Sequence, residues 1–106
     1  MEVQPIGAKH FSSSSTGVVQ IVKPADNVSG VVIRTGVMSS GGYSILSAGT
    51  ASPSDAFDFS KPILLMAGAA VTSQLQYPIS LPAGRGLWMA TSGNAGTVFV
   101  TYDLLP

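Results

Sequence analysis

The feature that most constrains the fold is a succession of short β-type runs, each closed by a cluster of turn residues. Residues 75–81 (LQYPISL) alternate between apolar and polar positions, which is typical of a strand with one buried face. Residues 96–104 alternate as well, with Val98 and Val100 on one face and Phe99 on the other. No window of 11 residues carries a helical stripe of apolar side chains. The chain is therefore expected to be all-β.

Five further runs rich in apolar or β-branched residues predict strands, over 17–23, 28–37, 43–47, 61–68 and 85–91. The turn residues 24–27 separate the first two of these runs and predict a hairpin. Pro82 and Gly84 predict another turn, with Gly84 at positive φ. Pro78 restricts the strand over 75–81 to a sheet edge, because it cannot donate a hydrogen bond. Seven or eight short strands with this spacing predict an antiparallel β-sandwich, jelly-roll-like in type.

The length of 106 residues suits one domain with one core. Residues 12–16 (SSSST) form a low-complexity run that ends a polar leader. We therefore expect an extended N-terminal arm or leader over residues 1–16 and the β-sandwich domain over residues 17–106. We expect residues 92–96 to form the loop of the last hairpin.

Charged side chains are scarce, at 9% of the sequence against about 25% in ordinary soluble domains. Gly, Pro, Ser and Thr fill 41 of the 106 positions instead, and the formal net charge is zero. The five basic residues are scattered singly, which argues against nucleic acid as a partner. No apolar run approaches the roughly 18 residues of a membrane span, so no membrane partner is expected. Because several strands look apolar on both faces, the missing charge favours a surface covered by protein partners.

Residues that could carry chemistry are few. His10 is the only histidine, and no nucleophile or second ligand is spaced to work with it. Asp55 and Asp58 resemble turn and capping residues more than a calcium loop, with Ser54 as the cap of a short turn. Asn27 opens a glycosylation sequon that we interpret as a chance match. We expect no enzyme activity, no metal and no cofactor; a cupin-like enzyme would need several histidines.

Large apolar side chains on the two-faced strands are the candidates for contact between subunits. Trp88 is expected in the core or an interface, because packing is the commonest role of large aromatics. The candidate oligomer interface consists of Phe11, Leu64, Met66, Trp88 and Phe99. Of these, Phe11 would act from the N-terminal arm as a clasp on a neighbour.

The stretch over residues 79–105 reads ISLPAGRGLWMATSGNAGTVFVTYDLL. It resembles the end of small β-sandwich virion proteins of tailed bacteriophages, namely capsid decoration (cement) proteins and the jelly-roll knobs of tail fibres. The resemblance implies a structural, non-enzymatic role in the virion, after synthesis in the host cytoplasm. It implies a homo-oligomer, with a trimer favoured, bound to the major capsid protein or another virion protein. A receptor- or glycan-binding knob of a tail fibre is the alternative.

Overall fold

The computed structural model describes residues 6–68 and 71–106, and this part of the chain is built almost entirely of strands. The only helical element in these residues is η1, a single 3-10 turn. All strand pairs are antiparallel. The all-β prediction is confirmed. The elements are β1 (Lys9–Val22), η1 (Pro24–Asp26), β2 (Val31–Ser40), β3 (Tyr43–Gly49), β4 (Ile63–Ala67), β5 (Val71–Gln74), β6 (Ile79–Leu81) and β7 (Gly86–Leu104).

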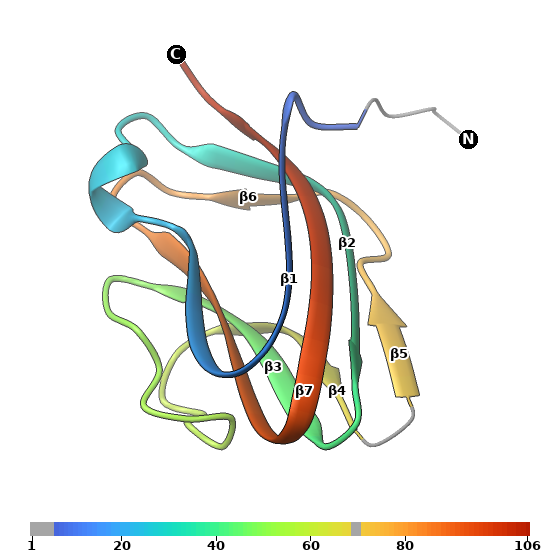
Figure 1. Cartoon of the computed structure of the whole chain (residues 1–106). Coiled ribbons are helices and arrows are strands. Elements are labelled where there is room, and N and C mark those ends of the chain that lie inside the picture. The colour runs from blue at the N-terminus through green and yellow to red at the C-terminus, as the bar shows by residue number, and fades with distance from the viewer. Residues whose placement is uncertain (1–5, 69–70) are drawn as a thin grey trace.

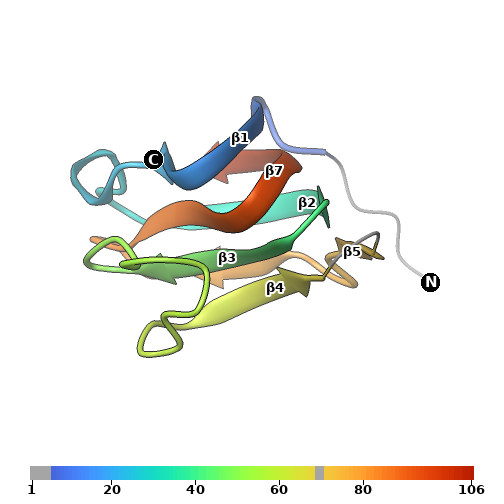
Figure 2. The same ribbon diagram turned by 60° about the horizontal axis from the view of Figure 1, so that its bottom comes forward.

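Two long, bent strands organise the fold. β1 pairs with β7 along most of its length, and Figure 1 shows the two curving side by side. On its other side, β7 pairs first with β3 and then, after the bend, with β2. β4 extends the sheet beyond β3, while β5 and β6 extend it beyond β2. One connected sheet thus folds over into a first layer around β3 and β4 and a second layer around β2, β5 and β6 (Figure 2).

Glycines lie where the strands bend from one layer to the other. Gly17 in β1 has a φ of +87° and Gly93 in β7 a φ of +86°. This left-handed backbone conformation carries a steric cost for side chains with a Cβ. Between β2 and β3 the bend falls at Gly41 and Gly42, and the Gly41 N–H donates to the Ala95 carbonyl across a distance of 3.4 Å. The bends at these glycines therefore take the long strands from one layer of the sandwich to the other.

The core lies between the two layers and explains the alternation in the sequence. Val98 and Val100 are buried, whereas Phe99 between them is 54% exposed. This is the pattern predicted for residues 96–104. The largest fully buried hydrophobic side chains come from both layers: Val31, Ile33, Met38, Ile45, Leu46, Leu87, Met89, Val98 and Val100.

A second, smaller apolar cluster covers the outer face of the first layer. Ile45 and Ala90 point away from the main core, and Ala56 from the β3–β4 loop closes over them. Trp88, on the same outer face, is only 4% exposed and its ring lies over Gly86. The strand over 85–91 is apolar on both faces because the chain itself covers both.

The predicted hairpin between residues 17–23 and 28–37 is wrong. β1 pairs with β7, and β2 pairs with β7, β5 and β6, so the two consecutive strands are not neighbours. Asn27, 2% exposed, holds the connection in place. Its Nδ2 donates to the carbonyls of Pro82 and Arg85, and its Oδ1 accepts from the Gly30 N–H, each at 2.8 Å. These bonds tie the turn to the β6–β7 connection, where Gly84 has the predicted positive φ.

The strand predicted over 75–81 is confirmed only in its last part. Residues 79–81 form β6, whereas residues 75–78, including Pro78, lie in the connection between β5 and β6. The Leu75 N–H donates to the Gly36 carbonyl at 2.9 Å, and the Leu75 side chain packs over Gly36. Both β5 and β6 pair only with β2, which is consistent with the edge position that Pro78 predicted.

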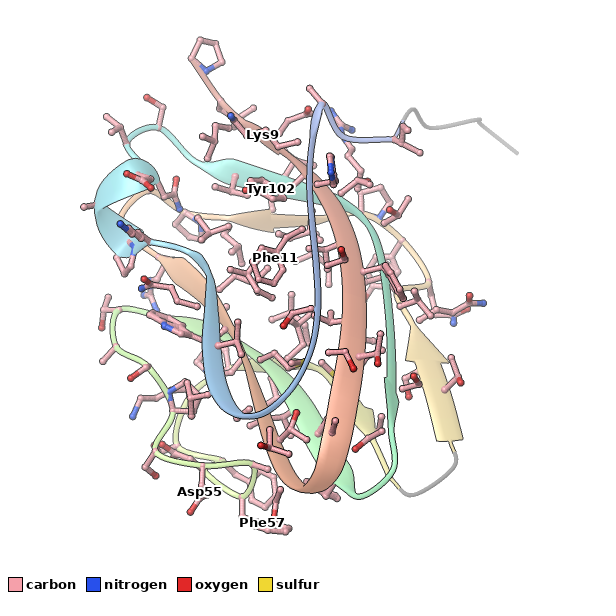
Figure 3. All side chains as sticks on the ribbon, in the orientation of Figure 1. Lys9, Phe11, Asp55, Phe57 and Tyr102 are labelled. Carbon is pink, nitrogen blue, oxygen red and sulfur yellow. The ribbon has the colours of Figure 1, made fainter. Side chains whose placement is uncertain are left out.

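Strand β1 begins inside the segment that was expected to be an arm. Residues 9–16 form the first part of this strand, and Phe11 lies opposite Val100 of β7. Figure 3 labels Lys9, Phe11 and Tyr102 in this part of the molecule. Residues 1–5 of the arm lie outside the described residues. The expected loop over 92–96 is likewise a bend within β7, which runs unbroken to Leu104.

Candidate interaction surface

The charged side chains of the described residues lie at strand ends and in loops. The strands β3, β4, β5 and β6 carry none. An interface built on these strands would bury no ionised group, so it would avoid the large cost of desolvating one. The charged residues form three groups: Lys9, Arg34 and Asp103; Asp55, Asp58 and Lys61; and Lys23, Asp26 and Arg85.

Asp103 anchors the first of these groups. It accepts from the Ala8 N–H at 2.7 Å and from the Arg34 Nε at 2.9 Å. The Ala8 hydrogen bond, then that of Arg34 and its charge, lower the pKa of the Asp103 carboxyl below its ordinary value. The bond to Ala8 holds the segment before β1 against the end of β7.

The outer face of the second layer is uncharged and rich in hydroxyl groups. Its centre is a cross-strand row in which Phe99 lies between Ser12 of β1 and Val37 of β2. In the neighbouring cross-strand rows, hydroxyl groups bond to one another, for example Thr35 to Thr101 at 2.7 Å. We call this surface the Phe99 face; it comprises Ser12, Ser14, Thr35, Val37, Ser39, Thr97, Phe99 and Thr101.

A groove of about 870 Å³ runs between the edges of β4 and β5, where the two layers of the sandwich part. The Ser73 hydroxyl crosses it to donate to the Met66 carbonyl at 2.5 Å. Met66 is 47% exposed at its rim. We call it the β4–β5 groove; it is lined by Ile63, Leu64, Leu65, Met66, Thr72, Ser73, Gln74 and Gln76.

The β3–β4 loop is held together by the carboxylate of Asp58. Its two oxygens accept from the backbone N–H groups of Ser54 and Ser60 and from both hydroxyls, and Lys61 lies 3.5 Å away. The bonds from Ser60 and Ser54, with the charge of Lys61, hold the Asp58 pKa well below its usual range. Asp58 thus has the capping role expected of it, whereas Ser54, expected as the cap, donates its own N–H and hydroxyl to Asp58.

Aromatic side chains stand out on this loop. The Phe57 ring stacks on Tyr43 with centroids 4.8 Å apart. Phe57 and Phe59 are both more than half exposed. Figure 3 shows Asp55 and Phe57 on the loop, at the opposite end of the view from Lys9 and Tyr102. The sequence signal for this surface is the pair of phenylalanines in the segment SDAFDF over residues 54–59.

The five sequence-predicted interface residues are dispersed. Leu64 and Met66 line the β4–β5 groove, and Phe99 is the centre of the Phe99 face. Phe11 is half-buried and packs against the chain's own core. Trp88 is buried within the chain and offers a partner almost no surface.

The residues considered for chemistry also have definite places. His10 lies opposite Thr101, at the margin of the Phe99 face. Asn27 is buried and its amide nitrogen makes two hydrogen bonds, so the asparagine of the sequon has a structural role. In residues 6–68 and 71–106, no three His, Cys, Asp or Glu side chains gather as a metal site. No helix in the same residues is long and apolar enough to cross a membrane.

No protein-family model matches this chain, and no curated protein matches it in sequence. Among solved structures, it is similar to the nucleoplasmin-like N-terminal domain of Drosophila FKBP39, with a TM-score of 0.50 and 13% identity. That match covers 94% of this chain and 92% of the other, and it supports the β-sandwich fold. A weak match to a structure of infectious bursal disease virus, Gx strain, has a TM-score of 0.30 and 16% identity. It covers 91% of this chain and 30% of the viral chain.

Proposed function

We propose that this chain is a non-enzymatic structural protein of a phage virion, a decoration or cement protein that stabilises the capsid shell. It acts as a homo-oligomer, with a trimer favoured, and its further partner is the major capsid protein or another virion protein. It is made in the host cytoplasm and resides in the virion. The observation that carries the proposal is the Phe99 face, an uncharged sheet surface with an exposed aromatic at its centre.

The energetics of the Phe99 face favour association. Burying the exposed half of the Phe99 side chain removes on the order of 100 Å² from water, which is about 2–3 kcal/mol per copy. The neighbouring hydroxyls already bond to one another, as Thr97 does to Ser14 at 3.2 Å. Covering them therefore costs less than covering charged side chains. A cement protein needs this kind of surface and no titratable groups.

Light scattering after gel filtration tests the homo-oligomer. The wild-type chain is expected to elute as an oligomer and Phe99→Ser as a smaller species. Val28→Ser is the matched control, because Val28 is 77% exposed but lies in the turn before β2. A wild-type monomer at high micromolar concentration contradicts the proposal.

Binding to particles tests the decoration role. Phage particles stripped of this protein are expected to disrupt at a lower temperature and to recover when the wild-type chain is added back. Cryo-electron microscopy of the restored particles then locates the added density. Density at the tail instead of the shell contradicts the decoration role.

A receptor- or glycan-binding knob of a tail fibre is the second candidate. The observation favouring it is the aromatic loop, where Phe57 is stacked on Tyr43 and Phe59 lies in solvent. Exposed aromatics on a braced loop are suited to stacking against sugar rings. Binding on a glycan array that is lost in a Phe57→Ala, Phe59→Ala double variant would favour this candidate. An array without hits argues against it.

A further inference from the structure

His10, the one histidine of the chain, points to the same side of the sheet as the Phe99 face. It lies on β1 directly opposite Thr101 of β7, and directly opposite residues of an antiparallel pair share a face. The pairing of the two strands is regular from Lys9 to Ser15, so the face does not change along this stretch. The His10 side chain is exposed there. It therefore belongs to the surface around Phe99.

His10 is close enough to Phe99 to be covered together with it. The two residues are diagonal neighbours in the β1–β7 pair, because Phe99 precedes Thr101 by two residues. Residues in this relation lie about 7–8 Å apart. A stable interface covers about 800 Å² on each partner, which is a patch of about 16 Å radius. A partner that buries Phe99 in an interface of this size therefore buries His10 as well.

The charged groups around His10 supply no net counter-charge. Among the described residues they are Lys9 on β1, Arg34 on β2 and Asp103 on β7, while β5 and residues 6–8 carry none. Lys9 is next to His10 along the strand and points to the opposite face. Asp103 shares the face of His10, but its two oxygens accept from the Ala8 N–H and from Arg34, whose charge balances its own. An imidazolium at His10 would therefore lack a partner of opposite charge when the face is covered.

The charge on His10 therefore opposes association. Histidine is the side chain that changes its charge between pH 5 and 8. Burying an unpaired charge costs more than burying the neutral ring. The neutral form is the one that a covered face accepts, and every copy in the oligomer buries its own imidazole. Association is then fully present above about pH 6.5, where histidine is ordinarily neutral, and is lost as the pH falls below it.

We propose that His10 is a pH-sensitive switch of the homo-oligomer, which forms while the imidazole is neutral and dissociates in mild acid when the imidazole is protonated. This inference rests on the homo-oligomer proposed above for the Phe99 face. It adds to that oligomer a residue that regulates it.

Sedimentation equilibrium at about pH 8 and at about pH 5.5 tests the proposal, because aspartate and glutamate stay mostly ionised in this range. The association constant of the wild type is expected to fall about tenfold for each copy in the oligomer, since roughly nine in ten free imidazoles are charged at the lower pH. His10→Gln stays neutral and is expected to associate equally at both pH values. His10→Lys is charged at both and is expected to associate as weakly as the wild type does in acid.

A relocated histidine is the matched control. The double variant His10→Gln, Gln20→His places the ring opposite Trp88, in the first layer and away from the Phe99 face. Its association is expected not to depend on pH. Both positions are exposed, so the core is unchanged, and far-UV circular dichroism at each pH verifies that the variants are folded.

The outcomes separate the switch from the oligomer. A wild-type oligomer that is equally strong at both pH values overturns the role of His10 and leaves the proposed oligomer standing. A pH dependence that persists in His10→Gln also overturns it, because another group would then be responsible. A wild-type monomer at the higher pH contradicts the homo-oligomer itself, and the switch with it.

Discussion

At the scale of single residues, Asn27 contributes more to the fold than its place in a turn suggests. It is a buried amide with both the carbonyl and the nitrogen in use, and its partners lie 3, 55 and 58 residues away. Such a residue links two connections that no strand pairing joins. Buried polar groups satisfied in this way are stabilising, and costly to disrupt.

We expect Asn27→Ala to lower the free energy of unfolding by about 2–4 kcal/mol, because the carbonyls of Pro82 and Arg85 lose their side-chain donor. Ser29→Ala is the control, since Ser29 is an exposed residue of the same turn. Its effect should stay within roughly 0.5 kcal/mol. Urea denaturation measures both variants. Equal stabilities would show that the Asn27 bonds contribute nothing.

At the scale of elements, the bend in β1 depends on one backbone conformation. A Cβ built on Gly17 meets no atom within 4 Å, and the same is true of Gly68. The two positions differ in φ, which is left-handed at Gly17 only. They therefore separate backbone strain from crowding.

We expect Gly17→Ala to destabilise the protein by about 1–2 kcal/mol, because alanine pays the steric cost of the left-handed region. Gly68→Ala, the matched control, should be neutral or stabilising by a few tenths to about 1 kcal/mol, since it restricts the unfolded chain. Thermal unfolding distinguishes the two. A Gly17→Ala variant as stable as Gly68→Ala would mean that the bend does not need a left-handed residue.

The β3–β4 loop is a second element with a specific dependence, here on the ionised Asp58. Its pKa is lowered in the folded loop by the bonds from Ser60 and Ser54. The stabilisation from this group is therefore fully present above the ordinary carboxyl pKa. It is lost as the pH falls through the lower value of the folded loop.

Acidification below about pH 4 is accordingly expected to loosen the loop, because the opened loop, in which Asp58 has its ordinary carboxyl pKa, then begins to bind protons while the folded loop does not. Amide exchange at Ser54 and Ser60, whose N–H groups donate to Asp58, measures the loosening. Asp58→Asn is expected to show fast exchange at every pH, because it removes the ionised acceptor. Protection of these amides relative to their intrinsic exchange rate that does not change with pH in the wild type would contradict this role of Asp58.

At the scale of the whole molecule, the scarcity of charge has two structural explanations. Part of it is internal, because the β3–β4 loop and the β1 connection cover the outer face of the first layer over Ala90 and Trp88. The other uncharged surfaces are the Phe99 face and the β4–β5 groove, which are exposed in the single chain. The charged groups are at the periphery of both surfaces.

If the Phe99 face forms the oligomer, association is expected to be nearly independent of salt. Screening acts on charge pairs, and none would cross this surface. The association constant should change by less than about twofold between 50 and 500 mM NaCl. Sedimentation equilibrium provides the measurement. A steep loss of association with salt would assign the contact to charged ends such as Arg34 and Asp103.

The sequence by itself determined the all-β class, the face alternation of residues 96–104 and the positive φ of Gly84. Each of these follows from local chemistry, the two-residue period of a strand and the steric freedom of glycine. Only the tertiary structure decided that β1 pairs with β7 instead of β2, because a turn signal does not specify the layer to which the next strand returns. It likewise decided that Trp88 is covered by its own chain while Phe99 is not. Both side chains point to the outer side of the same strand, β7, and the difference is that the chain itself covers this side in the first layer and leaves it open in the second.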